Sequence, residues 1–166
     1  MDVEEKTRSR DVRPAFFELA FGMKIGAVDP HSTDRKLEFR RGSGDKAETI
    51  NVRGQIDRVD VAHDGSGTAI AYDYKLSRGA TQDDMREGRA LQLHIYLAAL
   101  EQLFLPGNRI AGAGYFAIKG GDARRNQGLY RKEFAEYTGV RTQTASTLSD
   151  ADWERVRDEM RARIWE

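Results

Sequence analysis

The stretch from residue 50 to residue 76 reads INVRGQIDRVDVAHDGSGTAIAYDYKL. Apolar and polar residues alternate over residues 50–62 and again over residues 69–76, which predicts two β-strands. The link between them, HDGSG at residues 63–67, is rich in the residue types that form hairpin loops. We therefore expect the two strands to be antiparallel neighbours.

The sequence on either side of this hairpin supplies the remaining elements. Residues 36–41 are compatible with a strand, and residues 110–118 predict a strand buried on both faces. Residues 83–104 predict one long helix that stops at Pro106-Gly107-Asn108. A last helix is expected after Ser149 as its N-cap. Its apolar stripe consists of Trp153, Val156, Met160 and Ile164.

Strands, a helix, a strand and a helix follow one another, so the fold class is α/β or α+β. We expect a central mixed sheet of four or five strands flanked by helices, with the helix over residues 83–104 crossing the sheet. The length of 166 residues fits a single domain over residues 1–166.

Composition excludes several classes of protein. Lys+Arg and Asp+Glu both number 27, which argues against a strongly basic nucleic-acid coat protein. The chain has no cysteine, which removes disulfides, thiolate zinc sites, iron–sulfur clusters and cysteine nucleophiles. No apolar window is long enough for a membrane span, and the N-terminus lacks the apolar core of a signal peptide. The expected location is the cytoplasm.

Two acidic residues and a lysine are predicted to converge on the hairpin. Asp73 and Lys75 are two apart in one strand and therefore share a face. If the strands pair through the loop at Gly65, Asp57 reaches the same face. Two carboxylates on a rigid sheet suit Mg²⁺, which keeps several waters and accepts phosphate oxygens as further ligands. One such water can attack phosphorus, with Lys75 to orient or deprotonate it.

A single Asp-x-Lys triplet is more often an incidental ion pair on a solvated strand. The longer pattern G-x-I-D-R-x-D followed by D-Y-K is much less frequent by chance. Gln92 and Tyr96 add to it, because they are four apart on the predicted helix and share a face. Gln can bind the attacking water or a phosphate, and Tyr can donate to a DNA backbone or stack on a base.

GQIDRVD, YDYK and LQLHIY together resemble the PD-(D/E)XK nuclease superfamily, in its RecB-like branch, and most of all the AddB-type nuclease domains of bacterial helicase–nucleases. The resemblance implies a restriction-endonuclease-like α/β core. It implies metal binding by Asp57 and Asp73, a catalytic Lys75, and assistance from Gln92 and Tyr96. The run FFELAFG resembles a segment that precedes these motifs, which makes Glu18 a weaker candidate.

The resemblance also implies a function. We expect a DNA nuclease that uses Mg²⁺ or Mn²⁺ and acts in double-strand-break repair and recombination, with a helicase subunit or helicase domain as partner. The chain has no Walker A pattern and is therefore no ATP motor by itself. AddB-type domains carry a four-cysteine iron–sulfur site that this chain lacks, which fits either a fragment of a larger protein or a smaller stand-alone relative.

Two further points stay open at the level of sequence. Arg58 and Arg78 are the expected DNA contacts, because both lie beside the acidic motifs. The alternatives to a helicase-associated nuclease are a stand-alone exonuclease and a non-catalytic DNA-binding or assembly module with the same fold. The intact set of Asp57, Asp73 and Lys75 argues against the non-catalytic module.

Overall fold

A computed structural model of the chain describes residues 10–23, 26–76, 80–87, 90–119 and 127–166. Its centre is a six-stranded mixed sheet with the order β1-β4-β5-β6-β7-β8. β5 runs parallel to β6 and β7 parallel to β8, whereas the other neighbours are antiparallel. The strands are β1 (Val12–Phe21), β4 (Gly54–Ala62), β5 (Ala69–Lys75), β6 (Ile110–Ala117), β7 (Gly128–Arg131) and β8 (Thr147–Leu148).

The mixed sheet and the β4–β5 hairpin confirm the sequence predictions, but the expected number of strands was too low. β1 pairs with β4 along its whole length, although its sequence shows only a short apolar run. β7 and β8 are short strands in a polar region that carries little periodicity.

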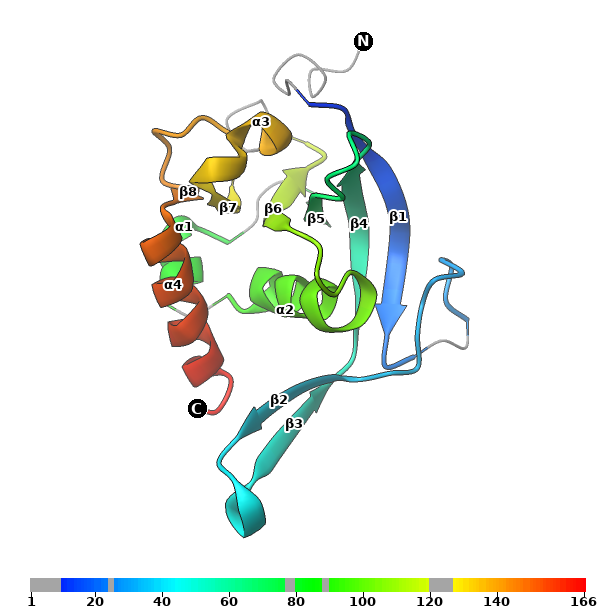
Figure 1. Ribbon diagram of the computed structural model, residues 1–166, viewed down its shortest axis with the longest axis vertical. Helices are drawn as coiled ribbons and strands as arrows, with labels where there is room; N and C mark the ends of the chain where they lie inside the picture. The colour runs from blue at the N-terminus through cyan, green and yellow to red at the C-terminus, as the bar shows by residue number, and fades with distance from the viewer. Residues whose placement is uncertain (1–9, 24–25, 77–79, 88–89, 120–126) are drawn as a thin grey trace.

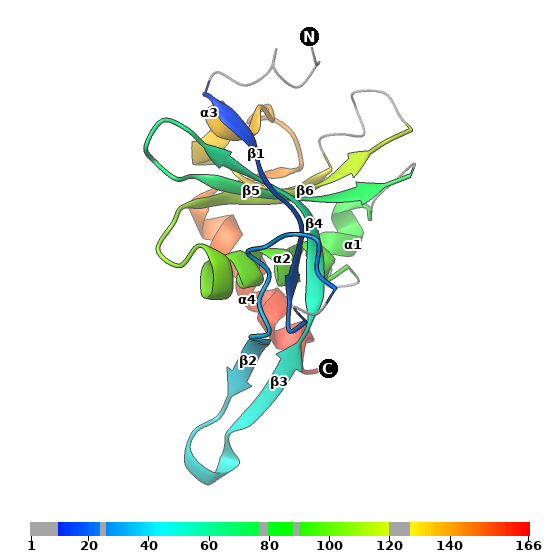
Figure 2. The ribbon, with the colours of Figure 1, turned by 90° about the vertical axis from the view of Figure 1, so that its right-hand side faces the viewer.

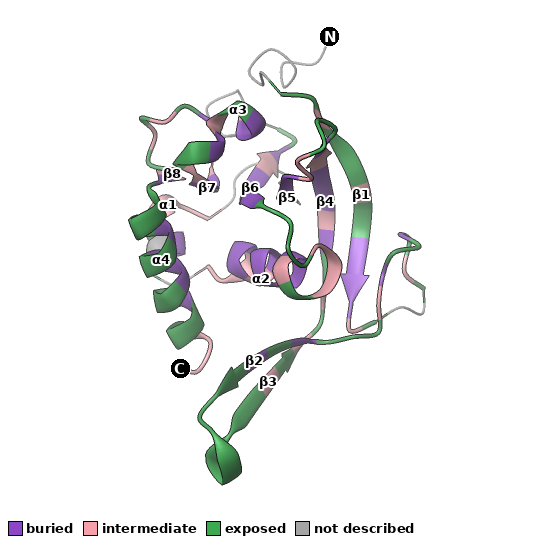
Figure 3. Cartoon of the chain, in the orientation of Figure 1, coloured by how far each residue is buried: buried purple, intermediate pink, exposed green. Residues whose placement is uncertain are grey.

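The strand expected over residues 50–62 is in fact two strands. β3 (Glu48–Val52) ends before Arg53, and β4 begins at Gly54. β3 pairs with β2 (Leu37–Arg41) instead of joining the sheet, and the 3₁₀ turn η2 (Gly44–Lys46) connects them. Figures 1 and 2 show this hairpin projecting from the body of the molecule as an arm. Most of its residues are exposed (Figure 3), although Leu37 and Phe39 of β2 are buried in the hydrophobic core.

The single helix expected over residues 83–104 is also divided. α1 (Gln82–Arg86) is a short helix with a capping box between Thr81 and Asp84, and its C-cap is Glu87. Gly88 follows in the sequence, a residue type that commonly succeeds a helix end. α2 (Gln92–Ala99) then continues into the π-helical turn η3 (Leu100–Phe104). The stop at Pro106 is where the sequence predicts it.

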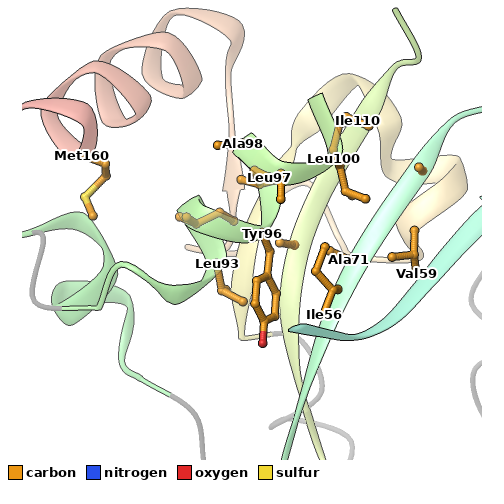
Figure 4. Close-up of a cluster of buried hydrophobic side chains, with 14 of the residues drawn as sticks. Ile56, Val59, Ala71, Leu93, Tyr96, Leu97, Ala98, Leu100, Ile110 and Met160 are labelled. Carbon is orange, nitrogen blue, oxygen red and sulfur yellow. The ribbon is translucent and has the colours of Figure 1, made fainter. Parts of the chain in front are cut away.

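Helices cover both faces of the sheet (Figure 2). α2 lies on one face, where Leu93, Leu97 and Leu100 pack against Val59 and Ala71 (Figure 4). The other face carries a second apolar cluster with η5 (Lys132–Phe134) and α3 (Ala135–Thr138).

α4 (Asp150–Arg163) packs beside α2 and joins the first apolar cluster. Its N-cap is Ser149, whose hydroxyl accepts a hydrogen bond from the Asp152 backbone N–H, as predicted. In the described residues, none of the helices has the length and apolar character needed to cross a bilayer.

The close contact between β6 and β7 requires a glycine at position 114. A Cβ atom at Gly114 in β6 would overlap the Tyr130 hydroxyl of β7. Tyr130 is buried and crosses over β6 at this point. The glycine therefore lets β7 pair with β6, which lies next to β5 in the sheet.

Candidate active site

Asp57 and Asp73 lie where the pairing of β4 with β5 ends. The last registered pair is Arg58 with Tyr72, so the two acidic residues occupy the next position along both strands. There the Asp57 carboxylate, instead of a backbone carbonyl, accepts a hydrogen bond from the Tyr74 backbone N–H over 2.7 Å. The end of the hairpin ladder thus brings the two carboxylates onto the face that α2 covers.

Asp73 is the centre of a hydrogen-bond network, and its side chain is buried. Its Oδ1 atom accepts from Gln92 Nε2 at 2.6 Å and from the Tyr96 hydroxyl at 3.1 Å. Its Oδ2 atom lies 2.7 Å from Lys75 Nζ, an ion pair without hydrogen-bond alignment. Lys75 Nζ also donates to Gln92 Oε1 at 3.0 Å. The Asp-x-Lys pair and the helix pair therefore form one cluster.

Gln92 and Tyr96 reach this cluster from the first turns of α2. They are four residues apart, and Gln92 Nε2 donates to the Tyr96 hydroxyl over 3.2 Å. Tyr96 is buried among apolar residues, with its hydroxyl at the end that meets Asp73. The predicted position of Gln92 beside the acidic pair is confirmed, and the five candidate side chains meet although they come from three elements.

The electrostatics of the cluster favour the protonated forms of Asp57 and Tyr96. Burial raises the pKa of the Asp57 carboxyl, and the charges of Asp73 and Glu18 raise it further. Burial and the charges of Asp73 and Asp57 raise the pKa of Tyr96 well above its usual range, so its hydroxyl stays protonated and donates a hydrogen bond. An added positive charge between Asp57 and Asp73 would relieve this repulsion.

Glu18, the weaker candidate, lies beside Asp57. β1 pairs Phe17 with Arg58 and Leu19 with Ile56, so Glu18 occupies the position opposite Asp57. Its φ of 52° is in the left-handed region, which few residues with a side chain adopt. The side chain is exposed, and its charge acts on Asp57.

Tyr115 was not predicted from the sequence. It pairs in register with Asp73 across the parallel β5–β6 ladder, and Lys75 Nζ lies 5.5 Å from its ring centroid. The ring is buried, and burial together with Asp73 and Asp84 raises the pKa of Tyr115 to about 12. In the sequence this tyrosine lies within an apolar strand and carries no motif of its own, so only the register of β6 could have identified it.

The two arginines expected to contact DNA have different outcomes. Arg58 is buried, and its Nε and Nη2 atoms donate to the two carboxylate oxygens of Asp60 at 2.6 and 2.8 Å. It points to the face opposite Asp57, because neighbouring strand residues alternate. Assigning Arg58 to the DNA surface was therefore wrong, and its role is in the core. Arg78 lies outside the described residues.

The donor set fits a divalent metal ion of the Mg²⁺ type. Asp73 Oδ2 is buried and accepts no aligned hydrogen bond, and one oxygen of Asp57 is engaged by Tyr74. Within the described ranges no group of three His, Cys, Asp or Glu side chains forms a complete metal cage. A two-carboxylate site is nevertheless typical of Mg²⁺, which takes its other ligands from water and substrate phosphate. Asp57 and Asp73 are the residues that would hold it.

Comparison with known proteins agrees with this geometry. The family model of the PD-(D/E)XK nuclease superfamily matches residues 1–166. The chain therefore belongs to the PD-(D/E)XK nuclease superfamily, and its six-stranded mixed sheet with flanking helices is consistent with a restriction-endonuclease-like fold.

Three curated relatives are each named as a subunit of an ATP-dependent helicase/deoxyribonuclease. The one from Clostridium tetani is 36% identical over 105 residues, which is 61% of this chain and 8% of the relative. The one from Desulforudis audaxviator is 42% identical over 77 residues, or 43% of this chain and 7% of the relative. The one from Bacillus mycoides is 37% identical over 98 residues, which is 57% of this chain and 8% of the relative. This chain spans less than a tenth of the length of each.

Proposed function

We propose that this chain is a metal-dependent deoxyribonuclease that hydrolyses phosphodiester bonds of DNA with Mg²⁺ or Mn²⁺. Membership of a nuclease superfamily supports a nuclease, and the names of the relatives support DNA as the substrate. The observation that carries the proposal is the cluster of Asp57, Asp73, Lys75, Gln92 and Tyr96 at the end of the β4–β5 ladder.

Each side chain has a chemical task in this proposal. A divalent ion would polarise the scissile phosphate and make bound water more acidic. Lys75 orients the attacking water, moves its proton, and offsets charge that develops on phosphorus. Gln92 binds both Lys75 and Asp73 and so fixes the ammonium relative to the carboxylate. Tyr96 holds Asp73 Oδ1 through its hydroxyl. This arrangement is preorganised, which is where electrostatic catalysis obtains most of its effect.

The wider context is also part of the proposal. The relatives are named as subunits of helicase–deoxyribonucleases, which supports a helicase subunit or domain as the partner and double-strand-break repair as the setting. A stand-alone exonuclease with the same site remains the alternative for that context. Co-purification with a helicase from the source cell, with a tag on this chain, separates the two.

The test is cleavage of end-labelled single-stranded and duplex DNA with Mg²⁺, Mn²⁺, Ca²⁺ or EDTA. Wild-type protein should cleave with Mg²⁺ or Mn²⁺ and not with EDTA. Asp57→Asn and Asp73→Asn should each lower the rate by at least about 100-fold, the usual effect of removing a group that stabilises a transition state.

Asp45→Asn is the matched control, because Asp45 lies at the tip of the β2–β3 arm, away from the site (Figure 1). It should cleave like wild-type protein. Metal-independent cleavage, or full activity of both acidic variants, would contradict the proposal. DNA binding without any cleavage would favour the non-catalytic module.

A further inference from the structure

An exposed apolar surface lies directly behind the candidate site. Tyr74 alternates with Asp73 and Lys75, so its side chain points to the opposite face of β5, and Leu76 follows directly after the strand. Phe116 pairs in register with Tyr74, and the two rings meet edge to face at 5.6 Å. Ile118 continues the ladder, because its N–H donates to the Lys75 carbonyl at 2.9 Å. We call Tyr74, Leu76, Phe116 and Ile118 the Tyr74 platform.

The platform is unusual for its exposure. Leu76 and Ile118 are 65% and 64% exposed, and Tyr74 is 36% exposed. Single exposed apolar residues are common on protein surfaces, but a contiguous cluster indicates a binding surface. α3 and η5 cover the same face further along, over Ala62, Ile70 and Tyr72, and their apolar cluster does not include the platform residues.

The rings of the platform are held in place from below. The Arg58 guanidinium lies 5.8 Å from the Phe116 centroid and 5.4 Å from that of Tyr72. Because Asp60 fixes Arg58 through two hydrogen bonds, Phe116 has a rigid support, and Phe116 in turn contacts Tyr74. A preorganised aromatic surface binds a planar ligand at a low cost in conformational entropy.

The two faces of the sheet differ in charge at the end of β5, with charged side chains on one face and the apolar Tyr74 platform on the other. Lys75 lies on the catalytic side, where its ammonium contacts the Asp73 carboxylate. A nucleic-acid strand has the matching division, with charged phosphates on one side and flat apolar bases on the other. In a duplex the base faces are stacked on one another, so only unpaired bases could use this surface.

We propose that the Tyr74 platform binds unpaired bases of the DNA strand next to the scissile phosphate. This inference rests on the proposed function, since the phosphate is placed at Asp57 and Asp73. The sugar-phosphate chain passes the end of β5 on the lysine side, and the adjoining bases turn onto Tyr74 and its neighbours. The sequence D-Y-K then carries two tasks in alternation, with Asp73 and Lys75 for chemistry and Tyr74 for the base.

Binding measured without cleavage tests the proposal. Fluorescence anisotropy in EDTA compares a labelled oligothymidylate of about 12 nucleotides, within the site sizes of single-strand binders, with an abasic strand of the same length and charge. Wild-type protein should bind the base-bearing strand more tightly. Tyr74→Ala should weaken that binding roughly tenfold and leave the abasic strand unchanged, as expected for the loss of one stacked base.

Two further variants keep the result interpretable. Tyr74→Phe retains the ring and should keep the preference for bases. Leu76→Ser removes a largely exposed apolar side chain, should fold normally, and should reduce the preference. Equal binding of both strands by wild-type protein, no binding of either at low salt, or an unchanged preference in Tyr74→Ala would overturn the proposal. The platform would then be assigned to a protein partner.

The outcome is separable from that of the proposed function. Metal-dependent cleavage decides whether the chain is a nuclease and is measured in the presence of Mg²⁺ or Mn²⁺. Base-dependent binding in EDTA without any cleavage would support the platform and reject the nuclease. Metal-dependent cleavage by wild-type protein without base-dependent binding would support the nuclease and reject the platform.

Discussion

The Tyr74 backbone N–H donates to the Asp57 carboxylate over 2.7 Å at the point where β4 and β5 stop pairing. This bond fixes Asp57 without neutralising it, since a backbone amide carries no net charge. Burial, together with repulsion from Asp73 and Glu18, raises the pKa of this carboxyl, although the Tyr74 hydrogen bond and the charge of Lys75 both lower it. The site is built so that the metal-free state holds unfavourable negative charge.

The first prediction is that Asp57→Asn stabilises the metal-free protein at pH 7. Asn keeps the oxygen that accepts from Tyr74 and removes the charge. Because the folded protein raises the pKa of Asp57 above its ordinary 3.8, the stabilisation from the protonated group is complete below that value and is lost as pH rises through the folded pKa. The variant should melt above wild type at pH 7, with a smaller difference near pH 4.

Differential scanning calorimetry at the two pH values, with and without Mn²⁺, measures this effect. Mn²⁺ should raise the melting temperature of wild-type protein and leave that of Asp57→Asn almost unchanged. A variant that melts below wild type at pH 7 without metal would contradict the assignment of repulsion to this carboxylate.

Asp73→Asn should have the opposite effect on stability. An Asn at this position can accept from Gln92 and Tyr96 with its oxygen, but its amide group then faces the Lys75 ammonium, donor against donor. We expect a loss of about 1–3 kcal/mol, less than the 3–5 kcal/mol of a fully buried pair because Lys75 is about one third exposed. Urea unfolding measures the loss, and calorimetry with Mn²⁺ should show weakened metal binding. Wild-type stability together with wild-type Mn²⁺ affinity would refute both roles.

We expect Arg58 to contribute to the stability of the fold and not to DNA binding. Arg58→Met leaves the fully buried Asp60 carboxylate without its bidentate partner, which should cost about 3–5 kcal/mol. The double variant Arg58→Met with Asp60→Leu should recover much of that loss, because no unpaired charge remains. Urea unfolding of the two variants gives the comparison. If the double variant is as unstable as Arg58→Met, the ion pair is not the cause.

Local pattern was sufficient for the parts of the fold that depend on neighbouring residues. The β4–β5 hairpin, the Ser149 cap and the spacing of Gln92 and Tyr96 are properties of short segments. The convergence on Asp73 follows, because strand alternation and helical spacing each leave one face for polar groups. Alternation also places Arg58 and Asp57 on opposite faces of β4. The prediction that Arg58 contacts DNA beside Asp57 did not take this into account.

Other features depend on partners distant in the chain. β3 leaves the sheet at Arg53 because it pairs with β2, which alternation within one strand cannot indicate. β1 joins the sheet by pairing with β4. Its own sequence does not show the alternation that would have predicted this long strand. Tyr115 enters the site only because β6 is parallel to β5 in a particular register.

Tyr115 should act as a positioning residue for Lys75. Its ring lies 5.5 Å from Lys75 Nζ, a distance at which the face of an aromatic ring attracts a cation. Tyr115→Leu removes that attraction and should lower the rate of the chemical step by about 3–30-fold, whereas Tyr115→Phe keeps the ring and should be close to wild type. Single-turnover rates over a pH range check this, and the Leu variant should show a displaced pH profile. Equal losses in both variants would indicate a role for the hydroxyl instead.

Lys75 gives the most direct test of the mechanism. Its ammonium contacts Asp73 Oδ2 and Gln92 Oε1, and its side chain is partly exposed, so Lys75→Met should fold and bind DNA nearly as well as wild-type protein. It leaves Asp57 and Asp73 less compensated, so Mn²⁺ should raise the melting temperature of the variant more than that of wild type. Cleavage should fall by at least about 100-fold, because positioning and charge stabilisation in the transition state are what the residue supplies.

The measurement is single-turnover cleavage of labelled single-stranded and duplex DNA, with saturating protein so that binding does not limit the rate. Lys46→Met is the matched control, because Lys46 is an exposed lysine in the η2 turn of the β2–β3 arm, away from the site (Figure 1). It should retain wild-type single-turnover rates. A Lys75→Met protein that cleaves as fast as Lys46→Met would show that the water is activated without the ammonium. The proposed role of the Asp73–Lys75 pair would then fail even if metal-dependent cleavage persists.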